Sequence, residues 1–147
     1  MRDYGDLTNK NLKALIVLSR CFLSVRRRET ETIRAGGLTV AQFAVLEILY
    51  HKGELPVATI TEKTLTSSGN MTVVIQNLAK AGYVRRKENP RDKRSYLVNI
   101  TKKGISLFEE VFPPHLENIN KIFSVLNDEE KDDLIRILKK LGNGEEL

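Results

Sequence analysis

The periodicity of the sequence changes at Gly82, and this change constrains the fold more than any other feature. Before the glycine, residues 68–81 carry apolar side chains at the spacing of one helix face. After it the spacing becomes that of strands, on either side of the turn-forming residues Asn-Pro-Arg-Asp at 89–92. A helix is therefore predicted to pass directly into a β-hairpin over residues 83–101. The hairpin residues expected to anchor to the core are Tyr96, Val98 and Ile100.

Two further helices are predicted before this one. Thr39 begins the first, with Gln42 three residues later at the spacing of a capping box, and Gly53 ends it. Pro56 is expected to occupy the first turn of the next, shorter helix. Two short helices joined by a brief turn and followed by a hairpin are typical of a winged helix-turn-helix. We therefore expect a mainly α (α+β) fold of this kind.

Longer helices flank this unit. One covers residues 8–31, and another begins at Thr101, with a kink or break expected at Pro113 and Pro114. A last helix, 128–141, has an apolar stripe that we expect to be buried. Its members are Leu134, Ile137, Leu138 and Leu141. The stripes of the long helices are too large for a small winged unit to cover, so a partner chain is expected.

Composition narrows the function classes. The chain has 147 residues, a net charge of +5 and 41% hydrophobic residues, which indicates one soluble domain and permits an anionic partner. It holds a single cysteine and no apolar run near the roughly 20 residues of a membrane helix, so we expect a reducing, cytoplasmic location. With two histidines and no catalytic, phosphate-binding or metal-ligand motif, we expect no enzyme activity, no cofactor and no metal site.

Several spaced features follow one another in a fixed order. Leu38-Thr39 is followed by Gln42-Phe43 and Leu46, and Leu78 by Gly82-Tyr83-Val84 and Arg86. The run Asp92-Lys93-Arg94 precedes Val98, Ile100-Thr101 and Gly104, and Leu126-Asn127 precedes Glu129-Glu130. Together these features resemble the MarR family of bacterial winged-helix regulators, over about Leu38 to Leu141.

The resemblance implies a homodimeric, ligand-responsive transcriptional regulator that binds pseudo-palindromic double-stranded DNA. Residues 1–147 would form a single MarR-like domain. Its winged helix-turn-helix lobe would span 38–101, and the dimerisation helices would span 8–35 and 102–147. The resemblance does not distinguish a repressor from an activator, although a repressor is the interpretation we adopt.

The recognition helix, 68–81, is expected to enter the major groove with its outward and N-terminal side chains. These are Ser67, Ser68, Asn70, Thr72, Val73, Gln76 and Asn77. Val73 stands where an arginine is frequent in the family, and this face carries no lysine or arginine before Lys80. Asn and Gln can bind adenine, and Val or Thr methyl groups can contact thymine. We therefore expect a site biased to A·T pairs.

The hairpin tip, 89–94, is expected to form the wing. Arg91, Lys93 and Arg94 would meet DNA there, and the resemblance places Arg94 in the minor groove, positioned by Asp92. A carboxylate two residues away limits the side-chain entropy that the arginine loses on binding. Asp92 can equally be a turn former that binds its own backbone. Both roles remain open.

Two alternatives to a ligand-responsive regulator remain. Cys21 can make the protein a thiol-based redox sensor, although a small, buried or half-buried side chain in a dimerisation helix is the more common role. A winged helix that binds other proteins is the second alternative. For the ligand-responsive regulator, the resemblance implies a small aromatic or amphipathic effector in a crevice lined by Phe22, Phe43 and Tyr50.

Overall fold

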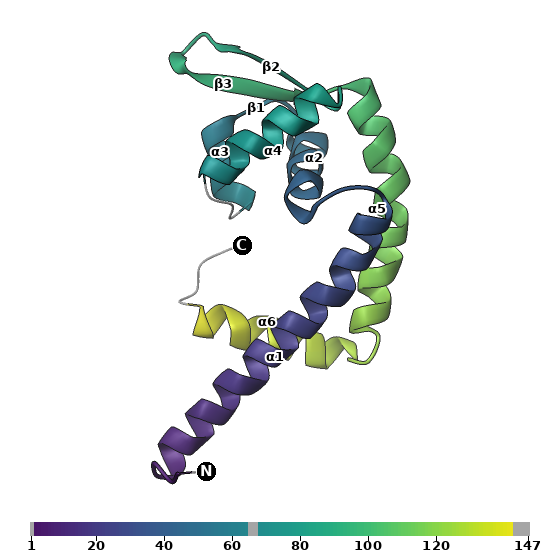
Figure 1. Cartoon of the computed structure of the whole chain (residues 1–147). Coiled ribbons are helices and arrows are strands. Elements are labelled where there is room, and N and C mark those ends of the chain that lie inside the picture. The colour runs from purple at the N-terminus through teal and green to yellow at the C-terminus, as the bar shows by residue number, and fades with distance from the viewer. Residues whose placement is uncertain (1, 65–67, 143–147) are drawn as a thin grey trace.

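The computed structural model describes residues 2–64 and 68–142. Along these residues the chain forms a winged-helix lobe between long helices (Figure 1). The elements are α1 (Asp6–Ala35), α2 (Val40–Lys52), β1 (Leu55–Pro56), α3 (Val57–Thr64), α4 (Ser68–Lys80), β2 (Val84–Asn89), β3 (Asp92–Ile100), α5 (Lys102–Phe123) and α6 (Asp128–Leu141). This order confirms the predicted fold class, including the change from helix to hairpin after Gly82.

Local signals in the sequence set most of the element boundaries. Thr39 and Gln42 form the predicted capping box of α2, and Asn127 forms a second one with Glu130 at the start of α6. Thr101 accepts a hydrogen bond from the Gly104 amide at the start of α5. Each cap satisfies amide groups that the first turn of a helix leaves unpaired.

Two proline predictions need correction. Pro56 lies in β1 and not in the first turn of α3, because residues 55–56 pair with residues 97–98 of β3. Pro113 and Pro114 do not break α5, which runs unbroken from Lys102 to Phe123. Val111 and His115 are buried on either side of the prolines, and this packing holds the helix where the backbone hydrogen bonds are missing.

The sheet is small and has the strand order β1-β3-β2, antiparallel throughout. Its inner end closes the lobe, because Val84 and Val98 are buried with the apolar faces of α2, α3 and α4. The core of the lobe is otherwise built from Phe43, Leu46, Ile60, Met71, Ile75 and Leu78. The outer end of the hairpin extends beyond these helices (Figure 1).

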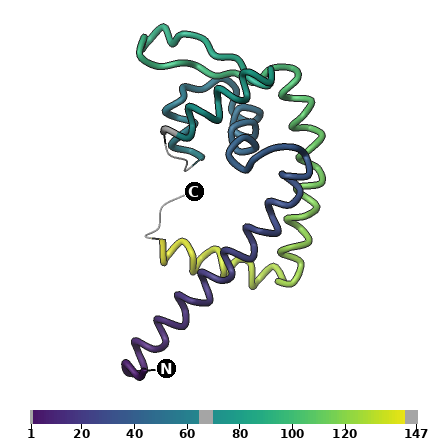
Figure 2. The backbone as a smooth tube through the Cα atoms, viewed as in Figure 1, coloured from purple at the N-terminus to yellow at the C-terminus, as the bar shows by residue number. Residues whose placement is uncertain are grey.

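The long helices α1 and α5, together with α6, extend away from the lobe, and we call these three helices the arms (Figure 2). α1 packs against α5 only through its C-terminal part, where Thr30 and Ile33 are buried. Leu15, Phe22 and other apolar residues nearer its N-terminus are exposed. In α6 no residue is buried, so no described part of the chain covers the stripe that was expected to be buried.

Among the described helices, none is by itself long and apolar enough to span a membrane. α1 and α2 reach that length and composition only as a pair, and they are bent by 76° relative to one another.

Candidate DNA-binding surface

The helical period divides α4 into an inner and an outer face. Met71, Ile75 and Leu78 are buried in the lobe. The opposite face is therefore exposed, and Val73 keeps 53% of its surface accessible. The other predicted side chains that are exposed on α4 are Asn70, Thr72, Gln76 and Asn77. Ser68 is the first residue of α4, and Ser67 lies outside the described residues.

The wing is a hairpin with an irregular tip. Glu88 pairs with Tyr96 but Asn89 pairs with Asp92, so residues 93–95 of β3 lie between the two pairs without a matching segment on β2. Such an irregularity turns side chains out of the ladder. Here it carries Lys93 and Arg94, which are exposed together with Arg91.

Asp92 holds the backbone of the tip. Its Oδ1 accepts a hydrogen bond from the Arg94 amide at 3.0 Å, and Asn89 Oδ1 accepts one from the Arg91 amide, also at 3.0 Å. No ion pair joins the Asp92 carboxylate to the Arg94 guanidinium within the described parts of the chain. The turn-forming role of Asp92 is thus the one present, and it fixes the main chain from which Arg94 extends.

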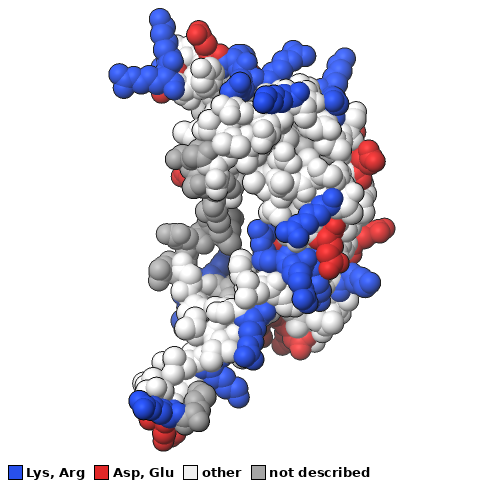
Figure 3. Space-filling model, in the orientation of Figure 1, with Lys and Arg blue, Asp and Glu red and all other residues white. Residues whose placement is uncertain are grey.

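Positive charge gathers over the wing and the adjoining edge of the lobe (Figure 3). The three cations of β2 differ in their surroundings. Lys87 Nζ lies 3.0 Å from Glu54 Oε1, so its charge is compensated. Arg86 faces the opposite way, with its guanidinium carbon 5.9 Å from the centre of the Tyr96 ring. Arg85 lines a separate hollow beside the start of α5, near Lys102.

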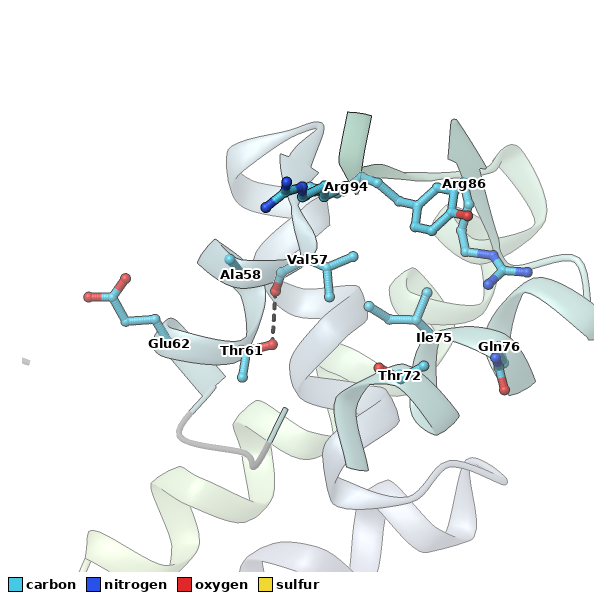
Figure 4. A pocket seen from close by; sticks show the side chains of 11 residues that line it. Val57, Ala58, Thr61, Glu62, Thr72, Ile75, Gln76, Arg86 and Arg94 are labelled. Atoms are coloured by element: carbon cyan, nitrogen blue, oxygen red, sulfur yellow. Dashed lines mark hydrogen bonds between the residues drawn. The ribbon is translucent and has the colours of Figure 1, made fainter. Parts of the chain in front are cut away.

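A larger hollow of about 750 Å³ lies between the wing and the two helices of the helix-turn-helix. We call it the wing hollow, and Figure 4 shows residues that line it. They are Val57, Ala58, Thr61 and Glu62 of α3, Thr72, Ile75 and Gln76 of α4, and Arg86, Arg94, Ser95 and Tyr96 of the hairpin. It brings the recognition helix and the wing residues to one surface.

The residues predicted for an effector crevice occupy two different places. Phe43 is buried, 4.8 Å from His115 between ring centres, and Tyr50 stands at the edge of the same cluster, 4.6 Å from Phe108. The Tyr50 hydroxyl donates to Glu109, a hydrogen bond that raises the pKa of the tyrosine. Phe22 lies apart, on the exposed face of α1, and makes no ring contact with this cluster within the described chain.

Cys21 is exposed on α1 in the single chain, so the buried or half-buried position expected for it depends on a partner. His115 is buried, with its Nδ1 3.3 Å from Thr32 Oγ1, and this links α5 to α1. Residues 2–64 and 68–142 contain no cluster of three or more His, Cys, Asp or Glu side chains that could hold a metal ion.

Two members of this surface were missed by sequence reasoning. Arg86 was predicted only to lie within the hairpin at 83–101, and the face of the strand that it occupies depends on the register. Tyr96 was expected to anchor to the core, yet 52% of its surface is exposed. It lies on the same face of β3 as Val98, which is buried, but beyond the end of the helices. The pairing of Arg86 with Val98 places Tyr96 diagonally next to Arg86.

Known proteins are similar to this chain both in the lobe that carries the candidate surface and in the helices around it. Residues 38–96 match the model of the MarR family. The HTH-type transcriptional regulator MhqR of Bacillus subtilis is 40% identical over 136 residues, which cover 92% of this chain and 94% of MhqR.

Two solved structures share the fold. One is BpsR of Bordetella bronchiseptica, whose DNA binding is regulated by 6-hydroxynicotinic acid; it is 26% identical, with a TM-score of 0.78, over 88% of this chain and 98% of BpsR. The other is a cysteine-to-serine mutant of MarR from Escherichia coli in complex with operator DNA. It is 24% identical, with a TM-score of 0.80, over 93% of this chain and 99% of that one.

Proposed function

The chain belongs to the MarR family of transcriptional regulators, and from this premise we propose that it is a cytoplasmic, ligand-responsive repressor that binds pseudo-palindromic DNA as a homodimer. In each subunit α4 enters the major groove and residues 89–94 of the wing enter the adjacent minor groove. The domain division follows the same roles: residues 38–101 bind DNA, while 8–35 and 102–147 hold the dimer.

One observation carries this proposal. Thr72 and Gln76 of α4 and Arg94 of the wing tip line the same hollow, so a single duplex can contact both elements. Arg91, Lys93 and Arg94 make no ion pair within the described residues, which leaves their charges available for phosphates. Neutral side chains on α4 then supply the contacts to base edges.

The side chains of α4 support recognition of A·T pairs. Val73 and Thr72 are exposed and offer methyl groups to thymine, and Gln76 and Asn77 are exposed and can bind adenine. Selection of binding sites from random DNA tests this assignment. We expect A·T pairs beneath α4, and fixed G·C pairs there would contradict it.

The exposed apolar faces of α1 and α6 support the homodimer. Leu23 keeps 67% of its surface accessible and Leu141 65%, and an apolar surface of this kind on two helices is more often an interface than a solvated face. A second copy of the chain presents the same helices, so the two sets can bury one another around a two-fold axis.

The aromatic cluster where α1, α2 and α5 meet supports an effector that is small and aromatic or amphipathic. Tyr50 is exposed at the edge of this cluster, beside the buried ring of Phe108, and the partner chain would complete a crevice there. Titration of a protein–DNA complex with small aromatic acids, including 6-hydroxynicotinic acid, tests this. Release of DNA at effector concentrations that also raise the Tm would support the proposal, and no release by any aromatic or amphipathic compound would contradict it.

A gel-shift with DNA from upstream of the protein's own gene tests the regulator itself. We expect a specific complex that resists competitor DNA of unrelated sequence. Equal competition by specific and unrelated DNA would contradict a sequence-specific function. The Cys21 alternative is tested in the same assay, where peroxide should not release DNA from the wild-type protein any more than from Cys21→Ser.

A further inference from the structure

Among the described residues, two contacts join a cation to an aromatic ring, and they have different surroundings. Lys103 Nζ lies 4.9 Å from the centre of the Tyr83 ring, but it also donates to the Ala81 carbonyl at 2.7 Å. That lysine is tied to the end of α4. Arg86 lies over the Tyr96 ring, 5.9 Å from its centre, and makes no ion pair within the described residues.

Arg86 lies between the two elements proposed to bind DNA, α4 and the wing tip. Its strand neighbour Lys87 faces away and is paired with Glu54, whereas Arg86 lines the wing hollow. In Figure 4 the guanidinium of Arg86 extends toward the side of the hollow where Gln76 lies, while Arg94 points away on the opposite side. A DNA strand that passes from α4 to the wing tip would therefore run past Arg86.

Tyr96 is suited to hold the Arg86 side chain without compensating its positive charge. A carboxylate partner would compensate the positive charge, as Glu54 does for Lys87. An aromatic ring attracts the guanidinium through its face and leaves the charge available. A contact over a ring also restricts a long side chain before binding, so less conformational entropy is lost when the complex forms.

We propose that Tyr96 is a positioning residue for DNA binding, which holds Arg86 over its ring so that the guanidinium contacts the DNA backbone between the major groove under α4 and the minor groove at the wing. This inference rests on the proposed function. It assigns the phosphate contact to Arg86 and gives Tyr96 no contact with DNA of its own.

A double-mutant cycle tests the inference, with a duplex recovered by selection from random DNA as the probe. The variants are Tyr96→Val, Tyr96→Phe, Arg86→Ala and the Tyr96→Val/Arg86→Ala pair. Tyr96→Val should raise Kd about two- to fivefold per half-site, the range expected for an exposed cation–aromatic contact. Tyr96→Phe keeps the ring face and should restore affinity to within about twofold of wild type.

Two further measurements separate positioning from a structural role. Arg86→Ala should lower the slope of log K against log salt concentration by about 0.9 for each phosphate that the arginine neutralises, one in each subunit. In the Arg86→Ala background, Tyr96→Val should have no further effect on Kd. The matched control is Lys103→Ala, which removes the other cation–ring pair and should leave both Kd and the slope unchanged.

The outcomes are distinct. An equal effect of Tyr96→Val with and without Arg86 would overturn the inference, as would an unchanged salt slope in Arg86→Ala. If Tyr96→Val does not fold, loss of affinity in the folded Tyr96→Phe variant would also overturn it. The proposed function fails separately, if the wild type binds no specific site or if Arg94→Ala has no effect.

Discussion

The lobe and the arms differ in where their apolar side chains are buried. In the lobe, α2, α3, α4 and the hairpin bury one another together with Ile33 of α1 and with Phe108 and Val111 of α5. This core needs nothing from outside the chain. In the arms, the N-terminal part of α1 and the length of α6 keep apolar side chains exposed. The lobe is therefore a folded unit with a free polar surface for DNA, and the arms are half of an interface. Changes in the two regions should have separable effects.

The salt dependence of DNA binding should show the largest effect and should depend on the lobe surface alone. A dimer that makes about 6–10 phosphate contacts should lose about 10³–10⁵-fold in affinity between 50 and 200 mM salt. Fluorescence anisotropy with a labelled duplex measures this. The dimer, held by apolar faces, should be insensitive to the same change, and salt-driven dissociation of the free protein would contradict that difference.

Charges on the arms should break the dimer and leave the lobe folded. Leu23→Asp combined with Leu141→Asp places a carboxylate on each exposed stripe, and burial of a carboxylate in an apolar interface is costly. We expect monomers, with DNA affinity reduced about 10²–10⁴-fold because the two half-sites are no longer linked. Light scattering measures the mass of the particle.

The matched control is the pair Leu23→Met and Leu141→Met, which keeps both stripes apolar and should remain dimeric. A dimer that persists with both aspartates in place would show that the interface lies elsewhere.

Substitutions at the wing tip should act on DNA and leave the dimer intact. Arg94→Ala should weaken binding about 10- to 100-fold. Asp92→Ala should weaken it less, although it makes the protein more positive, because the hydrogen bond to the Arg94 amide is removed. Asp92→Asn keeps an acceptor oxygen and should retain most of the affinity. Tighter binding by Asp92→Ala would refute the positioning role.

A substitution at Gly104 should destabilise the contact between the start of α5 and the lobe. A Cβ atom at this position would collide with the Tyr83 carbonyl and with Ile100. Gly104→Ala should therefore destabilise the fold by about 1–3 kcal/mol. Gly142→Ala, at the end of α6, would meet its nearest neighbour at 3.3 Å and should cost much less. Thermal unfolding compares the two; equal losses would contradict the packing described around Gly104.

Prediction from the sequence succeeded where structure is locally determined. The caps at Thr39 and Thr101 and the hairpin after Gly82 depend on a few adjacent residues, and all were predicted. The prediction was wrong where contacts between elements distant in the sequence determine the local structure. The strand at Pro56 exists because β3 pairs with it, and α5 continues through its prolines because Val111 and His115 on either side of them are buried.

The candidate site shows the same division. Which side of α4 is exposed could be predicted, because the helical period determines it. The contact of Tyr96 with Arg86 could not, because it requires the register of two strands and the point at which the helices end. The burial of the α6 stripe could not be settled within one chain, because the surface that would cover it is on another.

Selection of bound duplexes from random DNA, with the wild-type dimer, tests the central claim most directly. We expect an inverted repeat whose half-sites are separated by about one helical turn, 10–10.5 base pairs or a multiple of it, since two lobes related by a two-fold axis read them. Enrichment of a single unrepeated site, or of no sequence at all, would contradict it.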